Sequence, residues 1–431
     1  MSFDTPSRQP QRIAIVGGGI SGMAAAYLLS RDHSVTLYEA APRLGGHART
    51  VMAGLRGDQP VDTGFIVFNY VNYPHLTRMF RELDVPVTKS DMSFGATVDD
   101  GRVEYGLRDL SAVMGQKRNL LRPAYFRMLR DIMRFNNGAE ARADSDSTTI
   151  GELIEDMKLG DWFRRYYLTP ICGAIWSTPP EEIQSFPARS LVRFFRNHAL
   201  LSASGQHQWW TVKGGSIEYV TRLARHLENS GVTLRTGAAI TSVRRETHGV
   251  RVHTARAEPE HFDHIVMACH SDDALRLLAD ASPRETAALS DLRYQDNHII
   301  LHRDTRQMPR RKACWSSWVY KADAVDQRPA IGVTYWMNRL QNIPESDPLF
   351  VSLNPVKAVD QRLIYDEKTF RHPVFDRAAL SAQDQIAALQ GTRNTWFAGA
   401  YLRHGFHEDG FASAVRVARM ITAQRHGMLA A

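Results

Sequence analysis

The sequence predicts an α/β protein that combines one discontinuous domain with a second domain of the α+β class. A strand, a glycine-rich turn, a helix and a second strand follow one another near the N-terminus, and related patterns return after residues 205 and 390. The two intervening segments differ in pattern, because residues 76–204 are mostly helical and residues 276–389 alternate apolar and polar positions.

The N-terminal unit begins with the apolar run Arg12–Val16 (RIAIV), which we expect to be a strand. The glycine-rich turn 17–22 (GGGISG) follows, then the helical stretch 23–30 and the strand-like stretch 33–39, which ends in an acid. In such units the helix N-terminus faces the phosphates of a dinucleotide with free N–H groups. The order of these parts therefore predicts a Rossmann-like dinucleotide-binding domain.

Each glycine of the turn has a separate expected role. Gly17 permits the tight turn, Gly19 lets the backbone approach a pyrophosphate, and Gly22 lets the helix pack close to the strand. Glu39 lies 22 residues after Gly17 and can accept hydrogen bonds from an adenosine ribose. Because a carboxylate there would repel a 2′-phosphate, we do not expect NADP at this site.

Further strand and helix patterns complete this domain later in the chain. We expect the later strands to extend the N-terminal sheet. The chain then divides into a nucleotide-binding domain (1–75, 205–275 and 390–431) and a substrate domain (76–204 and 276–389). The expected elements are the helices Ile217–Asn229, after Gly214-Gly215-Ser216, and 409–424, and the strands 233–234, 240–244, Gly249–Thr254, 264–268 and 395–399.

The second insertion is expected to form an antiparallel sheet. Residues 297–303, 330–336 and 349–353 alternate apolar and polar side chains. Alternation of this kind places one face of a sheet against a buried surface. The substrate domain is thus predicted to combine an antiparallel sheet with a helical insertion.

Four separated motifs resemble those of the flavin-dependent amine oxidoreductase superfamily, which includes monoamine and polyamine oxidases, protoporphyrinogen oxidase and phytoene desaturases. Besides the glycine turn and Glu39, these are residues 40–50 (AAPRLGGHART), 62–65 (DTGF), 397–399 (FAG) and 405–410 (GFHEDG). The resemblance implies a Rossmann-like FAD-binding domain with FAD as the cofactor. The cofactor-binding residues that follow are Gly17, Gly19, Ile20, Ser21, Gly22, Glu39, Ala40, Arg43, Gly45, Gly46, His47, Ala48, Gly64, Phe65, Ile66, Ile240, Gly399, Phe406, His407 and Asp409.

Two places depart from the superfamily pattern. His47 stands where relatives carry an arginine near the pyrophosphate and the flavin. Ala400-Tyr401 stands where amine oxidases usually have Thr-Glu, so the contact of that glutamate with the ribityl chain is not implied here.

More narrowly, the chain resembles a bacterial family of NAD/FAD-binding, amine-oxidase-like proteins. The matching stretches are residues 173–177 (GAIWS), 195–198 (FRNH), 334–338 (TYWMN) and the GFHEDG motif. Members of that family are often encoded beside cyclopropane-fatty-acyl-phospholipid-synthase-like methyltransferases. This resemblance implies dehydrogenation of a modified acyl chain, with an acyl-modifying methyltransferase as a partner.

The entry to the last helix carries the candidate catalytic residues. Backbone N–H groups at a helix N-terminus can stabilise the negative charge that develops on a reduced flavin, and we expect Asp409 to cap this end. His407 and His404 are candidate proton donors or acceptors, although a structural role is the alternative. Phe406 can shape a pocket beside the flavin but cannot hydrogen-bond.

The second insertion is rich in aromatic side chains, which would suit an apolar substrate. The alternative is that these residues only fill the core of a mixed domain. The predicted substrate pocket consists of Trp315, Tyr335, Trp336 and Phe406.

The chain is basic, with 53 lysines and arginines against 46 acids and a net charge of +7 over 431 residues. Only eight of the basic residues are lysines. Residues 116–136 and 189–196 mix arginines with large apolar residues, which is typical of a helix on an anionic membrane or of an ordinary surface helix. No nucleic-acid partner is expected, because the basic residues are spread along the chain.

The chain contains Cys172, Cys269 and Cys314, which form neither a disulfide framework nor a CxxC motif, and no metal site is expected. Residues 1–11 lack the apolar core of a secretory signal, and no run is apolar enough to span a bilayer. We expect a cytoplasmic protein, with peripheral attachment to the inner face of the membrane as the alternative. Relatives with a covalent flavin attach it to a cysteine upstream of the FAG motif. The last cysteine here, Cys314, lies well before Phe397, so the resemblance implies noncovalent FAD.

Three functions remain open at this stage. The preferred one is an FAD-dependent oxidoreductase that takes hydride from a C–H bond of an apolar, lipid-like substrate, with a tunnel whose mouth lies near residues 118–134 and 189–196. The second is an amine oxidase that uses O2. Many amine oxidases hold a lysine near the flavin on the strand that begins the second insertion, but no lysine occurs here between Lys213 and Lys312, and the strand carries Asn297 and His298, so the resemblance disfavours this function. The third is a flavin-binding partner protein without turnover.

Overall fold

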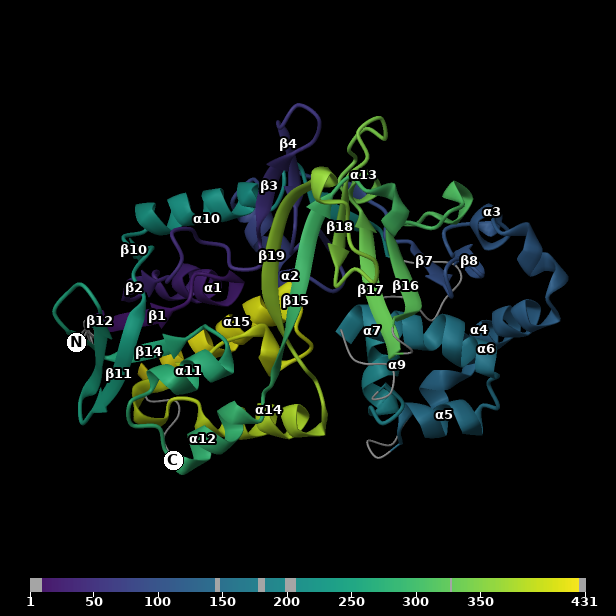
Figure 1. Ribbon diagram of the computed structural model, residues 1–431. Helices are drawn as coiled ribbons and strands as arrows, with labels where there is room; N and C mark the ends of the chain where they lie inside the picture. The colour runs from purple at the N-terminus through teal and green to yellow at the C-terminus, as the bar shows by residue number, and fades with distance from the viewer. Residues whose placement is uncertain (1–9, 144–147, 177–182, 198–206, 326–327, 426–431) are drawn as a thin grey trace, which may run out of the picture.

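The structure is a computed structural model, and it describes residues 10–143, 148–176, 183–197, 207–325 and 328–425. Ser177 and His198, which belong to the narrower family resemblance, lie outside the described residues, as does most of the polar N-terminal stretch. Figure 1 shows a parallel sheet with its helices at one side, a long antiparallel sheet in the middle and a group of helices at the other side.

The N-terminal strand lies in the middle of a five-stranded parallel sheet. The glycine turn leads directly from this strand into α1 (Ile20–Leu29), one turn earlier than the apolar pattern suggests. Helices α1, α10 (Ile217–Asn229) and α15 (His407–Arg425) pack on one face of the sheet. The strand order is β10 (Thr233–Arg235), β2 (Ser34–Tyr38), β1 (Arg12–Val16), β14 (His264–Met267) and β20 (Thr395–Phe397).

Two of the later strands do not extend this sheet, contrary to the sequence prediction. β11 (Ile240–Glu246), β12 (Gly249–Thr254) and β13 (Glu260–Phe262) form a separate antiparallel sheet. Only two residues connect β11 to β12, which allows a hairpin but not the crossover that parallel neighbours need. This small sheet packs on the other face of the parallel sheet.

The antiparallel sheet of the second insertion is larger than predicted. It has seven strands, and two of them, β7 and β8, come from the first insertion, which was expected to be mostly helical. The charged strand β19 lies at one edge, where solvent contact favours such residues. The strand order is β19 (Ile364–Pro373), β15 (Tyr294–His302), β18 (Phe350–Leu353), β17 (Arg328–Trp336), β16 (Trp318–Val325), β7 (Phe94–Val98) and β8 (Val103–Gly106).

Helices of the first insertion cover one end of this sheet (Figure 1). The expectation of one basic helix over 116–136 is wrong in its start, because Pro123 occupies the first position of α4 (Pro123–Arg142). A 3-10 turn, Lys117–Leu121, precedes it. Proline fits the first turn of a helix but not its interior, which explains the break. The other helices here are α5 (Ile150–Asp156), α6 (Asp161–Phe163), α7 (Thr169–Trp176) and α9 (Ala188–Asn197).

The packing also crosses the predicted segment boundaries. α12 (Pro283–Ser290) and α14 (Arg377–Leu389) pack against the parallel sheet together with α11 (Ser271–Leu277). β6 (Val87–Ser90) pairs with β9 (Trp209–Val212), which also pairs with β5 (Val67–Phe68). The domain division itself stays a prediction. No helix among the described residues has the length and apolar character that a bilayer crossing requires.

Candidate active site

A large cavity of about 880 Å³ lies between the parallel sheet and the seven-stranded sheet. Its walls come from the glycine turn, the segment 63–67, the end of β14, the face of the seven-stranded sheet and the start of α15. Small-molecule sites usually enclose about 300–1,000 Å³, so this cavity is large enough for a cofactor-sized ligand.

The glycine turn presents backbone donors to the cavity. Gly17, Gly19, Ile20 and Ser21 line it, and α1 begins without a side-chain cap. A Cβ at Gly19 would meet nothing nearer than the Cα of Gly46 at 3.9 Å, so this backbone is open to a ligand. The first N–H groups of an uncapped helix bind anions such as a pyrophosphate.

Gly22 does not line the cavity, and the structure gives it a packing role instead. A Cβ on Gly22 would lie 1.8 Å from the carbonyl oxygen of Gly17. No side chain fits in this space, which agrees with the close helix–strand approach that the sequence predicted.

Glu39 follows β2 and lines the cavity. Its carboxylate accepts the N–H of Gly18 at 2.6 Å and the N–H of Ala41 at 2.8 Å. These bonds hold the acid at the carboxyl end of the sheet, and each carboxylate oxygen retains capacity for another donor.

The loop after Glu39 is held by Arg43, which does not itself line the cavity. Its guanidinium donates to the carbonyl oxygens of Leu44, Gly46 and Ala48. This places Gly46 and His47 on the cavity wall. Arg43 thus stabilises the loop that carries Gly46 and His47 without lining the cavity itself.

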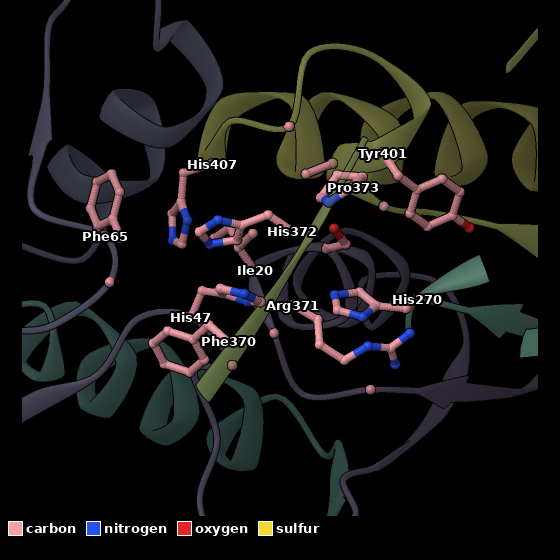
Figure 2. A pocket seen from close by; sticks show the side chains of 18 of the residues that line it. Ile20, His47, Phe65, His270, Phe370, Arg371, His372, Pro373, Tyr401 and His407 are labelled. Atoms are coloured by element: carbon pink, nitrogen blue, oxygen red, sulfur yellow. The ribbon is translucent and has the colours of Figure 1, made fainter. Parts of the chain in front are cut away.

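Five histidines line the cavity, and three of them gather at one side in Figure 2. Burial lowers the pKa of His47 and His407 to about 3 and the pKa of His372 to about 4. Burial also lowers the pKa of His270 and His404. Since an ordinary histidine pKa is about 6.5, all five are neutral near pH 7.

His47 is the residue that replaces the arginine of the superfamily motif. Its ring lies 4.6 Å from the ring of Phe370 and 5.5 Å from that of His372. Its buried Nε2 has no hydrogen-bond partner in the part of the chain that the structure describes. A buried polar atom of this kind usually has a partner, so the ring fits a bound polar ligand.

His407 is fixed from two sides. Its ring stacks on Phe65 at 4.0 Å between centroids, and its Nε2 lies 2.6 Å from the Tyr219 hydroxyl. Burial raises the pKa of Tyr219, so the phenol keeps its proton, and the direction of the hydrogen bond follows the tautomer of His407. Nothing in the sequence singled out Tyr219, apart from its place on the helix after the Gly-Gly-Ser turn.

Asp409 holds the start of α15, but not as its N-cap. The helix begins at His407, and the Asp409 carboxylate accepts the N–H of Phe406 at 3.0 Å. Asp409 therefore occupies the third helical position and reaches back to the N-cap residue, as in half of a capping box. The adjacent Glu408 accepts the N–H groups of His75 and Leu76 and so ties α15 to α2 (Pro74–Glu82).

The face of the seven-stranded sheet forms the apolar wall of the cavity. Tyr335 pairs with Trp318 on one neighbouring strand and with Val351 on the other. All three residues line the cavity, together with Ile299 and Leu353. Successive residues of a strand point to opposite faces, which is why Val351 and Leu353 both line the cavity while the residue between them does not.

The expectation that Trp315 and Trp336 line the pocket needs correction. Trp336 follows Tyr335 on β17 and points to the other face of the sheet. There it packs with Trp315 at 5.2 Å between rings, and with Phe350 in a separate buried cluster. The tunnel mouth also differs from the prediction, because no described residue of 118–134 or 189–196 lines the cavity.

The formal charges of the cavity lie away from this apolar wall. Glu39 lies beside the glycine turn, and Asp273 and Arg276 lie on α11 and pair with each other at 2.8 Å. Arg371 pairs with Asp272 and Asp273. The part of the wall that strands β15–β18 form with Met92, Trp209 and Phe406 carries no charged side chain among the residues described, whereas the edge strand β19 adds Arg371 to the cavity lining.

Most of the residues predicted for the site meet around this cavity, although their contact with a cofactor stays a prediction. Those that line it are Gly17, Gly19, Ile20, Ser21, Glu39, Ala40, Gly46, His47, Gly64, Phe65, Ile66, Ile240, Tyr335, Gly399, His404, Phe406 and His407. Those outside the lining are Gly22, Arg43, Gly45, Ala48, Asp409, Trp315 and Trp336.

Backbone donors of α1 and the acid after β2 face the same cavity, which is the arrangement of a dinucleotide-binding protein. The comparisons with known proteins agree with this class. A family model described as flavin-containing amine oxidoreductase matches residues 20–311. The chain belongs to this family, and FAD is its cofactor.

Individual relatives match over short stretches. Coproporphyrinogen III oxidase from Mycobacterium tuberculosis is 40% identical over 78 residues, which are 17% of this chain and 16% of that protein. Protoporphyrinogen oxidase 2 from Arabidopsis thaliana is 51% identical over 55 residues, which are 12% of this chain and 11% of that protein. These matches span less than a fifth of either relative's length.

Solved structures match over the whole chain. A fatty acid isomerase from P. acnes, described as producing CLA, has a TM-score of 0.67 at 16% identity and covers 95% of this chain and 98% of its own. Cyclohexylamine oxidase from Brevibacterium oxydans has a TM-score of 0.65 at 16% identity, with 97% and 100% covered. At such low identities the likeness shows the fold.

Proposed function

We propose that this protein is an FAD-dependent oxidoreductase that takes hydride from a C–H bond of an apolar, lipid-like substrate. The observation that carries the proposal is the uncharged part of the cavity wall that strands β15–β18 form. Apolar side chains cover this wall, and the histidines beside it are neutral. An acyl chain buried there would gain about 0.8 kcal/mol per methylene.

The same wall argues against an amine substrate. An alkylammonium ion loses its hydration on entering a closed site and needs a carboxylate or facing aromatic rings in return. Of the cavity acids in the described chain, Asp273 is paired with arginines and Glu39 lies at the glycine turn. The stacked ring pairs on the described wall are Phe65–His407 and His270–Tyr294, each containing a histidine.

The residues of the cavity fit FAD in their chemistry. The uncapped N-terminus of α1 with Gly19 would bind the pyrophosphate, and Glu39 would accept the ribose hydroxyls. The unpartnered Nε2 of His47 would hydrogen-bond the cofactor. FAD, when bound, supplies the hydride acceptor of the reaction.

The chain's own catalytic contribution is to position the substrate and keep charge and water away from it. Tyr335 and Leu353 would align the chain against the cofactor, and alignment supplies much of the rate advantage. His407, held by Tyr219 and Phe65, would present its imidazole to the cavity in a fixed orientation. Because burial keeps His407 neutral, it would act as a neutral hydrogen-bonding group and not as a cation.

The fold comparisons contain examples of both substrate classes. The similar fatty acid isomerase acts on an acyl chain, and the similar cyclohexylamine oxidase acts on an amine. The first favours the lipid proposal, in which a methyltransferase that modifies acyl chains would act before this protein.

Product analysis tests the proposal. The FAD-loaded protein would be incubated with fatty acids, phospholipids and primary amines, with Tyr335→Ala as a control, and the products would be measured by mass spectrometry. We expect acyl chains that have lost two hydrogen atoms, one as hydride to FAD and one as a proton to a neutral histidine of the cavity, and a lower yield with the variant. Aldehydes formed from amines alone would instead assign an amine oxidase, and no product from any class would assign a flavin-binding partner protein.

We also propose that FAD is bound without a covalent link. Of the cysteines, Cys269 alone lines the cavity, and burial raises its thiol pKa to about 12, so the thiol stays protonated. Acid precipitation should release all of the yellow colour into the supernatant. Colour that stays in the pellet would show a covalent flavin.

A further inference from the structure

A surface far from the cavity exposes large apolar side chains. It comprises α3 (Leu110–Val113), the 3-10 turn Lys117–Leu121 and the first half of α4, and we call it the α3–α4 surface. Of the 11 large hydrophobic residues exposed in the described chain, six lie here within 24 consecutive positions. They are Leu110, Met114, Leu120, Leu121, Phe126 and Met133, and Leu121 and Leu110 are 84% and 78% exposed.

These side chains lie close together. Leu120, Leu121 and Phe126 line one shallow hollow with Arg127 and Arg130. On α4, Arg130 and Met133 follow Phe126 at four and seven positions, so all three lie on one face of the helix. The opposite face of α4 is buried in the core of the protein. The Tyr125 hydroxyl donates to the carbonyl oxygen of Val113 at 2.7 Å and so fixes α3 against α4.

The charge of this surface is of one sign. Between residues 110 and 130 the sequence has five basic residues and no acid. The flanking acids are engaged, because Asp109 bonds Arg108 and caps α3, and Asp131, on the buried face of α4, pairs with Arg130 and Arg134 at 3.5 Å. The five basic residues are Lys117, Arg118, Arg122, Arg127 and Arg130.

We propose that the α3–α4 surface docks on an anionic phospholipid membrane. Exposed leucine, phenylalanine and methionine can enter the boundary between head groups and acyl chains, while arginines beside them pair with lipid phosphates. Arginine stems cover apolar surface and keep the guanidinium at the phosphate level. A second copy of this chain fits poorly, because two such surfaces would bring ten cations together.

This inference goes beyond the proposed function and does not rest on it. Docking requires only the outer surface, whereas the substrate class depends on the cavity. If the protein binds vesicles but converts no acyl chain, the docking proposal stands and the proposal of a lipid substrate is wrong.

Vesicle co-sedimentation of the FAD-loaded full chain tests the proposal. The vesicles would contain phosphatidylcholine alone or with phosphatidylglycerol, at low and high salt. We expect binding to the anionic vesicles that weakens at high salt. Replacing Arg118 and Arg127 by glutamine should weaken it about tenfold or more, and the double variant Leu121→Ser, Phe126→Ser should do the same by loss of apolar insertion.

A matched control uses exposed apolar residues elsewhere. Met52 and Leu55 lie on the hairpin of β3 (Thr50–Ala53) and β4 (Gln59–Asp62) and are 57% and 64% exposed. The double variant Met52→Ser, Leu55→Ser should bind vesicles as the parent does. Melting curves and flavin content would confirm that each variant folds. Equal losses in both apolar variants, or no binding by the parent, would overturn the proposal. If the parent protein is a dimer and the double variant Leu121→Ser, Phe126→Ser is a monomer, the surface serves self-association instead.

Discussion

The two sides of the cavity are built by different means. The nucleotide side is made of backbone groups, namely the N–H groups of the glycine turn and of α1, with Glu39 held by two further N–H groups. The substrate side is made of side chains, because residues of strands β15–β19 form its wall. A backbone site tolerates few residue types, whereas a side-chain wall is free to change with the substrate. We therefore expect the nucleotide side to determine which cofactor binds and the substrate side to determine which substrate binds.

The first prediction separates packing from cofactor contact on the nucleotide side. Gly22→Ala should prevent folding of the flavoprotein, because the added Cβ would lie 1.8 Å from a backbone oxygen, and this outweighs the gain of about 1 kcal/mol that alanine brings to a helix. Gly19→Ala has open space and should fold normally, but lose FAD affinity by about tenfold or more, or about 1.4 kcal/mol. Melting curves and flavin content after dialysis measure both effects. If both variants fold equally well and retain FAD equally, the distinction between a packing glycine and a cofactor-binding glycine is wrong.

The second prediction compares two neighbours on one strand. Trp336→Ala should destabilise the protein by about 3–5 kcal/mol and leave the KM for the substrate unchanged, because its ring packs on the far face of the sheet. Tyr335→Ala should raise that KM about tenfold with a smaller loss of stability, since its ring faces the cavity. Denaturant titration and steady-state kinetics provide the two readouts. A KM effect of Trp336→Ala alone would reverse the assignment of the two faces.

The third prediction concerns Glu39. Glu39→Arg removes the acceptor for the ribose and should cost about 1.5–3 kcal/mol of FAD binding, which is tenfold to a hundredfold in affinity. Glu39→Gln keeps the shape and one acceptor, so its loss should be smaller. Titration of the apoprotein with FAD, followed by flavin fluorescence, measures both. Unchanged affinity in Glu39→Arg would mean that this acid does not contact the cofactor.

The smallest expected effect is a pH dependence of stability at the start of α15. Burial raises the pKa of Glu408 from 4.5 to about 7 in the folded protein. The stability that this group contributes is therefore complete below about pH 4.5 and is lost as the pH rises through about 7. Glu408→Gln cannot ionise, so it should gain about 1–2 kcal/mol relative to the parent between about pH 5 and pH 8. A stability difference that does not change with pH would show that Glu408 ionises normally.

The nucleotide side could be predicted from the sequence because its determinants are local. The Gly17–Gly22 turn, the strand before it and Glu39 lie within one short segment, and each residue type follows from a steric or electrostatic need. The helix Ile217–Asn229 and the single strands β1, β2 and β14 were predicted for the same reason. The separate sheet β11–β13 was missed because strand patterns do not state which strands pair.

The substrate side could not be predicted because it depends on long-range pairing. Alternation predicted strand β17, but not whether Tyr335 or Trp336 faces the cavity, since a one-residue change in register exchanges the faces. β7 joins β16 across more than 200 residues of sequence. Tyr219 was missed because its partner, His407, lies 188 residues away.

Anaerobic mixing of the FAD-loaded protein with a matched pair of ligands tests the central claim most directly. The pair would be a fatty acid and a primary amine of equal chain length, and the measured quantity is the loss of the flavin's visible absorption. The uncharged wall predicts bleaching by the acyl chain at a rate that falls in Tyr335→Ala, and no bleaching by the amine. Bleaching by the amine alone, at a rate that Tyr335→Ala leaves unchanged, would contradict the account.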